Sequence, residues 1–225
     1  MRHTAAILAA LMAASIAAAA STTIDFSDLI GTLSDYYPIP NGYDSFAANT
    51  PDIAVSYSTN YGMDGTCSSS VMVTFVSFWQ GQYGDLPAVA YPMLDGHYAI
   101  ISLTPNPGYE VTLESFLMAG YPAGGGSEPG QTISVDNGLL QPYPGADYSP
   151  YTIGNTGDTM FAPDITSTGT LNIVFGPSWD IGIDDITFSE QYVGLPDAAN
   201  SILLLGAAIL SLACYSKVFT AALRS

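Results

Sequence analysis

Short segments in which apolar and polar residues alternate run through the middle of the chain, separated by turn residues. Ile53, Val55 and Tyr57 alternate with small residues, which is typical of a half-buried β-strand. Residues 71–79 are β-branched or aromatic on both faces, so we expect a central strand buried between two layers. The alternation predicts further strands at 21–29, 97–103, 109–118, 131–136, 159–162, 170–175 and 181–189.

Glycine, proline and asparagine fill the intervals between these segments. Pro105-Asn-Pro-Gly108 predicts a tight turn that joins its two neighbouring strands into a hairpin, and residues 58–70, 80–95 and 137–157 are expected to be loops. Nothing between residues 21 and 195 has a sustained helical period. The sequence therefore predicts an all-β fold, an antiparallel β-sandwich or jelly roll.

Uncharged apolar runs mark both ends of the chain. Arg2 and His3 precede the first run, which ends in small residues before Ser21, so residues 1–20 are expected to be a helical secretory signal peptide. The second run, residues 198–216, has about nineteen uncharged residues, about enough to cross a bilayer as a helix. Lys217 and Arg224 follow it, as the positive-inside tendency expects. We therefore expect an exported β-sandwich domain at 21–193 and a C-terminal segment with a transmembrane helix at 194–225.

The charged residues are distributed very unevenly. Arg2, Lys217 and Arg224 are the only lysine or arginine residues of the chain, and nineteen of its twenty acidic residues lie between 21 and 195, which gives this region a formal charge of −19. Nucleic acid is excluded as a partner, because binding phosphates needs surface cations. Such an acidic surface suits cation binding, sugar stacking or simple solubility by self-repulsion.

Two adjacent acids, Asp184 and Asp185, stand between Ile183 and Ile186 in the last predicted strand. On a regular strand they face opposite sides, so one would be directed inward. A buried carboxylate needs a partner, and this region has no lysine or arginine to supply one. A hard cation such as Ca²⁺, with six to eight oxygen ligands, is one solution. Backbone and hydroxyl donors, or a bulge that keeps both acids solvated, are the alternatives.

Catalytic residues are not evident in the sequence. His97 is the only histidine outside the signal peptide, and no Gly-x-Ser-x-Gly motif occurs. On one face of a strand, Glu110 and Glu114 would lie about 13 Å apart, too far for a glycosidase acid and base. Cys67 and Cys214 have neither metal-ligand spacing nor a disulfide framework. A non-enzymatic protein is therefore expected, with a secreted glycan-active hydrolase or a plain membrane-anchored structural coat protein as the alternatives.

Aromatic residues gather in the predicted loops and at strand ends. Aromatic faces with a polar handle suit both sugar rings and the loop packing of β-sandwiches, so both interpretations stay open. The candidates are Tyr36, Tyr37, Tyr43, Trp79, Tyr143, Tyr148, Tyr151 and Trp179.

The C-terminal segment carries a resemblance to a known family. Gly194-Leu195-Pro196-Asp197, the apolar run and the basic end resemble the PEP-CTERM class of bacterial sorting signals, in its variant that starts with Val-Pro-Asp. This chain has Leu in place of Val and one Lys in place of an Arg cluster. The resemblance implies that an exosortase-type membrane transpeptidase recognises Pro196 and Asp197, removes the tail and delivers the domain to the cell surface or extracellular matrix. A plain membrane anchor is the alternative.

A second resemblance covers residues 24–28, 103–116 and 181–188, which are similar to exported proteins of that class with a galactose-binding-like jelly roll. Such domains are similar to carbohydrate-binding modules, which implies polysaccharide as a partner. In these modules a structural Ca²⁺ lies between the first and last strands. Carried over to this chain, the resemblance implies that Asp25 or Asp28 meets Asp184 or Asp185 at such an ion.

Overall fold

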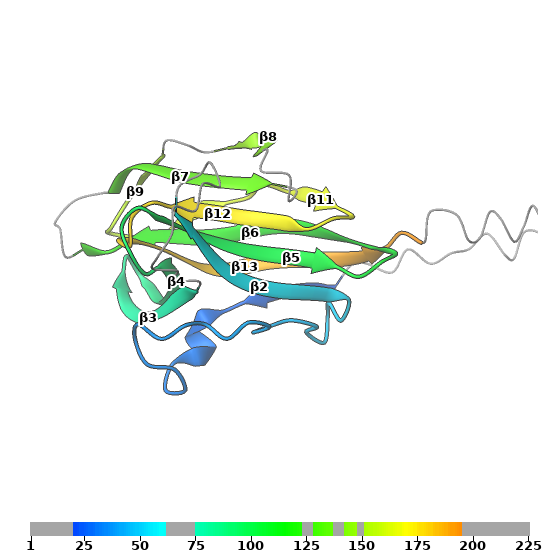
Figure 1. Cartoon of the computed structure of the whole chain (residues 1–225), viewed down its shortest axis with the longest axis horizontal. Helices are drawn as coiled ribbons and strands as arrows, with labels where there is room; N and C mark the ends of the chain where they lie inside the picture. Colours follow the sequence, from blue (N-terminus) through cyan, green and yellow to red (C-terminus); the bar gives the residue numbers. More distant parts are fainter. Residues whose placement is uncertain (1–19, 62–74, 123–127, 137–141, 148–150, 195–225) are drawn as a thin grey trace, which may run out of the picture.

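A computed structural model of the chain describes residues 20–61, 75–122, 128–136, 142–147 and 151–194 (Figure 1). Pro196, Asp197, both cysteines and both predicted terminal helices lie outside these ranges, apart from Ala20. Within them, no helix is long and apolar enough to span a membrane.

Two antiparallel sheets make up the described region. The seven-stranded sheet has the order β10-β6-β13-β4-β3, with β1 paired to β13 and β11 to β6. Its strands are β1 (Ser21–Ile24), β3 (Val76–Tyr83), β4 (Leu86–Pro92), β6 (Tyr109–Gly120), β10 (Thr159–Phe161), β11 (Ile165–Ser167) and β13 (Ile181–Tyr192). The six-stranded sheet has the order β2-β5-β12-β7-β8, with β9 paired to β7. Its strands are β2 (Ile53–Tyr61), β5 (His97–Pro105), β7 (Glu128–Asp136), β8 (Pro142–Asp147), β9 (Tyr151–Ile153) and β12 (Leu171–Gly176).

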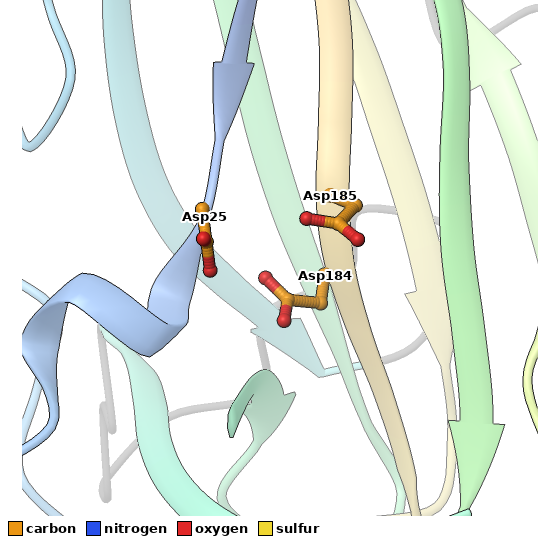
Figure 2. A group of neighbouring side chains, drawn as sticks. All are labelled: Asp25, Asp184 and Asp185. Carbon is orange, nitrogen blue, oxygen red and sulfur yellow. The ribbon is translucent and has the colours of Figure 1, made fainter. Parts of the chain in front are cut away.

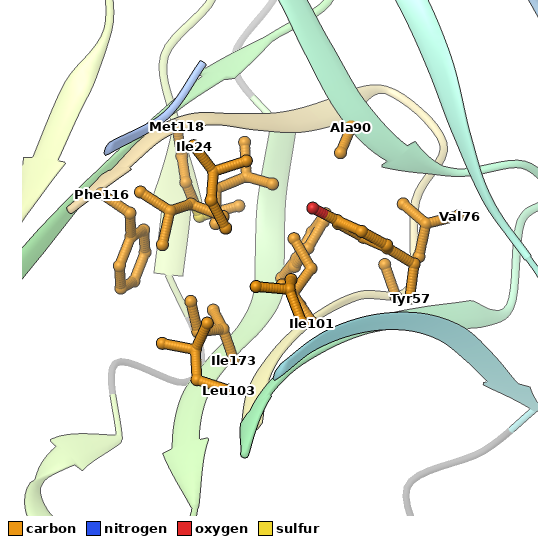
Figure 3. Close-up of a cluster of buried hydrophobic side chains, with 14 of the residues drawn as sticks. Ile24, Tyr57, Val76, Ala90, Ile101, Leu103, Phe116, Met118 and Ile173 are labelled. Atoms are coloured by element: carbon orange, nitrogen blue, oxygen red, sulfur yellow. The ribbon is translucent and has the colours of Figure 1, made fainter. Parts of the chain in front are cut away.

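The core lies between the inner faces of the two sheets, because alternate residues of each strand point inward. Figure 3 shows Ile101 and Ile173 from the six-stranded sheet in one cluster with Met118 of the other sheet. All three side chains are fully buried. The predicted all-β antiparallel sandwich is therefore confirmed for the described residues.

The predicted hairpin between residues 97–103 and 109–118 is wrong. Strand β5 pairs with β2 and β12, whereas β6 belongs to the other sheet and pairs with β13. Pro105 to Gly108 therefore carries the chain from one sheet to the other. Both strands bury one face in the same core, so their alternation cannot distinguish such a crossing from a hairpin.

Strand β3 is also placed differently from the prediction, because it lies at the end of its sheet and not at the centre. The N-terminal segment covers its outer edge. Tyr36 N–H donates to the Phe78 carbonyl (3.0 Å), and Phe78 N–H donates to the Tyr37 carbonyl (2.9 Å). Both faces of this end strand are also covered, since Phe78 lies in the main core and Trp79 packs against a second apolar cluster, which explains its composition.

Three segments that were expected to be loops or left unassigned contain strands. Residues 80–95 were predicted to be a loop because of Pro87 and Pro92, but Leu86–Pro92 forms β4, which pairs with β3 and buries Val89 and Tyr91. Strands β8 and β9 lie within the predicted loop 137–157, and β11 lies in a segment without an assignment.

Candidate cation site

Asp25 ends the first strand. Residues 21–29 were expected to be one strand, but β1 stops at Ile24, and Phe26–Leu29 form a short 3-10 helix, η1. Asp25 Oδ1 accepts a hydrogen bond from Ser27 N–H (2.8 Å), which is how an aspartate caps a helix start and why the strand does not continue. The change of direction also turns the Phe26 N–H toward β13.

Asp184 receives that N–H. Its Oδ1 accepts a hydrogen bond from Phe26 (2.9 Å), and the Asp184 side chain is only 1% exposed. Phe26 is itself fully buried in the core. One carboxylate of β13 therefore holds the start of η1, directly after β1, and β1 itself pairs with β13 from Ser21↔Ser189 to Ile24↔Ile186.

A bulge in β13 decides where the neighbouring Asp185 points. The register of β13 against β6 shifts between Asp184 and Thr187, and Asp185 has the left-handed φ of 49°. Regular alternation, on which the prediction of opposite faces rested, is broken here. One carboxylate oxygen each from Asp25, Asp184 and Asp185 lie within 4.8 Å of one another (Figure 2). Asp28 is exposed on η1 and is not part of this group.

These carboxyls repel one another and are poorly solvated. Burial raises the pKa of Asp184 to about 7, although backbone hydrogen bonds from Phe26 and Asp185 oppose the change; the charges of Asp185 and Asp25 add to it. The pKa of Asp185 is raised by burial and by the charges of Asp25 and Asp158. No lysine or arginine occurs between residues 21 and 195 to offset this.

Further acidic residues lie near the three carboxylates. The Tyr43 hydroxyl donates to the Asp25 carbonyl (2.7 Å). Next to it, burial raises the pKa of Asp44 to about 6, with contributions from the charges of Asp28 and Asp25. The site therefore attracts positive charge, and either a proton or a metal ion can supply it.

The donor set fits a hard cation. Three carboxylates converge, each has two oxygens with several lone pairs, and the hydrogen bonds from Phe26 and Ser27 use only part of that capacity. Oxygen ligands of this kind are those that Ca²⁺ prefers, with backbone carbonyls and water completing six to eight positions. Asp25, Asp184 and Asp185 are thus the residues that would hold the ion.

The same group has one feature of a glycosidase site, since burial raises the pKa of Asp184 to about 7 and other carboxyls lie close to it. A general acid must, however, reach the glycosidic oxygen of its substrate. Asp184 is almost fully buried and already accepts a hydrogen bond from the backbone. Its surroundings therefore suit an enclosed ion better than proton transfer to a polymer.

The predicted aromatic residues separate into two environments. Trp79 and Trp179, a hundred residues apart, both pack against Tyr121, at centroid distances of 6.0 and 5.5 Å. Tyr36 stands edge-on to Trp79 at 4.6 Å. Tyr43 instead packs on Phe26 beside the carboxylates. For Tyr143 and Tyr151 the structure describes the backbone alone, and Tyr148 lies outside the described residues.

No family model and no curated protein matches this sequence. Several solved structures, among them the following three, resemble the chain at low scores. The CBM22-1 xylan-binding domain from Paenibacillus barcinonensis Xyn10C is 9% identical, with 79% of this chain and 99% of that domain covered and a TM-score of 0.27. TmCBM61 in complex with β-1,4-galactotriose is 16% identical, with 71% and 99% covered and a TM-score of 0.22. The enzymatically active domain of bacteriophage CBA120 tailspike protein 4 is 17% identical over 67% of this chain, with a TM-score of 0.29, and the chain spans only 21% of that protein.

The raised pKa of Asp184 predicts how stability depends on pH when metal is removed. An unfolded aspartate titrates near 3.8, and the native carboxyl near 7, so the native state holds this proton more tightly. Protonated Asp184 therefore contributes up to about 4 kcal/mol to the free energy of unfolding. This contribution is fully present below about pH 4 and is lost as the pH rises to about 7. We expect denaturant unfolding in chelator to show the full-length chain losing free energy of unfolding over this interval.

Two variants isolate the source of that loss. Asp184→Asn keeps an oxygen for the Phe26 N–H but cannot ionise, so it should flatten the profile up to pH 7. Asp44→Asn should flatten only the part below about pH 6, where Asp44 titrates. Identical slopes for Asp184→Asn and the unmodified chain between pH 6 and 7.5 would contradict this account of Asp184.

Proposed function

We propose that this protein is an exported, non-enzymatic component of the cell surface or extracellular matrix, that its domain is stabilised by Ca²⁺, and that it contacts polysaccharide. The observation that carries the proposal is the convergence of Asp25, Asp184 and Asp185 in a region without lysine or arginine. Extracellular modules bind Ca²⁺ with dissociation constants of about 10⁻⁴–10⁻³ M. A domain that depends on such a weak site is suited to the outside of the cell.

Polysaccharide contact is supported by the aromatic residues around Trp79 and Trp179. Six rings in mutual contact form this aromatic cluster: Tyr36, Trp79, Tyr83, Tyr91, Tyr121 and Trp179. Tyr36 lies at the surface, with 56% of its side chain exposed. Apolar ring faces beside polar groups suit sugar rings. The absence of lysine and arginine from residues 21–195 disfavours anionic partners in general.

The C-terminal segment supplies the localisation part of the proposal. Residues 198–216 would hold the exported chain in the membrane until an exosortase-type transpeptidase acts at Pro196-Asp197. The last described residues, at the end of β13, lead directly into this signal. The domain would then be released to, or joined to, the surface matrix.

Calcium should raise the melting temperature of the purified full-length chain. At an ion concentration about 100 times the dissociation constant, binding adds about 2.7 kcal/mol, which corresponds to several degrees for a domain of this size. The gain over chelator should be larger at pH 8 than at pH 5, because protons compete for Asp184. Differential scanning calorimetry measures both values.

Asp25→Asn and Asp184→Asn should each lose most of this calcium response. Glu110→Gln, on β6 opposite Gln191, removes the same charge far from the group and should keep it. A wild-type melting temperature that is equal in Ca²⁺ and in chelator would rule the ion out.

Processing of the tail predicts a specific C-terminus. Protein isolated from its own host should end near Pro196-Asp197, or be joined there to another molecule, when its intact mass and C-terminal peptide are determined. Replacing Pro196 and Asp197 by Ala should leave the tail in place. Native protein that ends at Ser225 would instead indicate a plain membrane anchor.

A further inference from the structure

An open depression of about 570 Å³ lies beside the aromatic cluster, and its lining includes Tyr36, Tyr91, Leu94, Asp95 and Trp179. The volume is within the range of small-molecule binding sites, which are mostly apolar with a few placed polar groups. The residues come from separate parts of the sequence, so only the fold brings them together. Tyr36 and Leu94 both expose part of their side chains at this surface.

The rings of the depression are held from behind. Trp79 meets Tyr36 edge-on at 4.6 Å and an interplanar angle of 82°, and it meets Tyr91 edge-on at 6.4 Å. Tyr121 supports Trp179 at 5.5 Å. Edge-to-face contacts at these distances are favourable, so the ring positions exist before any ligand arrives.

Tyr36 is fixed at the rim through its backbone. It has a φ of 69°, a left-handed conformation that is costly for a bulky residue, and its N–H donates to the Phe78 carbonyl (3.0 Å). More than half of its side chain nevertheless faces solvent. Because the backbone and Trp79 hold this ring, its exposed part is a fixed surface onto which a sugar ring can stack.

Trp179 is fixed by the turn that leads into β13. Gly176 has a φ of 151°, and a Cβ there would come within 2.6 Å of the His97 carbonyl oxygen, so only glycine allows the turn to approach β5 this closely. The Tyr83 hydroxyl donates to the backbone carbonyl of Trp179 (2.6 Å), and the backbone N–H of Trp179 donates to Asp95 Oδ1 (3.4 Å). Trp179 and the Asp95 carboxylate are therefore held side by side.

The charge of the depression is negative. Asp95 lines the depression and Asp180 lies close enough for the two charges to interact. Carboxylates accept hydrogen bonds from sugar hydroxyls, but they repel uronic acids and sulfated sugars. In the described part of the chain, the lining contains no lysine or arginine, and His97 is its one side chain that can take up a positive charge, against the two carboxylates.

We propose that this depression is the binding site for a neutral sugar chain, whose rings stack on Tyr36 and Trp179 while its hydroxyls donate to Asp95. This inference rests on the proposed polysaccharide contact and adds its location and its preference for uncharged sugars. It does not depend on the calcium site.

Tryptophan fluorescence tests the proposal directly, because the chain has only two tryptophans and both belong to this cluster. The full-length chain is titrated with soluble xylan, galactan, mannan and β-glucan as neutral probes, and with polygalacturonate as the anionic probe. We expect at least one neutral probe to shift the emission saturably and polygalacturonate to have no effect. Affinity electrophoresis in gels that contain the same polymers measures binding independently of fluorescence.

Single substitutions then separate the site from the rest of the surface. Tyr36→Ala should weaken binding at least about fivefold through the lost stacking, and Asp95→Asn by a comparable factor. Tyr37→Ala is the matched control, because Tyr37 is the next residue, is 59% exposed and is absent from the lining. Tyr37→Ala should bind like the unmodified chain.

Each other outcome overturns a different statement. Binding of a neutral probe that is unchanged in Tyr36→Ala and Asp95→Asn would place the contact elsewhere, and the proposed function would stand without this site. Binding of polygalacturonate as tight as that of the neutral probes would contradict the charge argument. Failure of all neutral probes in both assays would remove the polysaccharide contact itself.

Discussion

The burial of one carboxylate in a domain that has no lysine or arginine is the constraint on which the rest of the structure depends. Asp184 fixes the Phe26 N–H across 158 positions of sequence and so joins the start of the domain to its last strand. The hydrogen bond fixes the position of Phe26 in the core, but it cannot neutralise the charge of three converging carboxyls. Whatever supplies the missing positive charge therefore contributes to the closure of the sandwich.

Strand β13 connects this constraint to the surface. It pairs with β1, β4 and β6, and thus stands inside the seven-stranded sheet. The turn before it carries Trp179, and the bulge with Asp184 and Asp185 follows a few residues later. Between the two, Gly182 packs so closely that a Cβ would lie 2.6 Å from Val89 Cγ2 and 3.0 Å from Tyr83. The carboxylate group and the aromatic depression are thus held by one tightly packed strand, which suits a rigid binding surface.

The sequence was sufficient for the fold class, because alternation at Ile53, Val55 and Tyr57 and similar segments reports directly on half-buried strands. It also predicted that one of Asp184 and Asp185 is directed inward, and Asp184 is buried. The prediction assumed regular alternation, which the bulge interrupts. The bulge was one of the alternatives that the sequence left open: aspartate is enriched at positive φ, but most aspartates have ordinary backbone angles, so Asp185 alone could not decide for it. The crossing of β5 to β6 between sheets, and the meeting of Tyr36 with Trp79 and Trp179, depend on pairings between distant segments that no local pattern records. Strand β4 was missed because Pro87 is typical of a loop, although proline is tolerated at the start of a strand.

The most direct test of the central claim is a count of bound metal. Protein purified without added metal, equilibrated with Ca²⁺ at pH 8 and measured by native mass spectrometry, should carry one calcium ion per folded chain, and the ion should be missing from Asp184→Asn at the same free calcium concentration. Such a result would show that a calcium ion supplies the positive charge that residues 21–195 lack. Wild-type protein that is folded and stable at pH 8 without a bound ion would contradict the claim, because protons and backbone donors alone would then keep Asp184 buried.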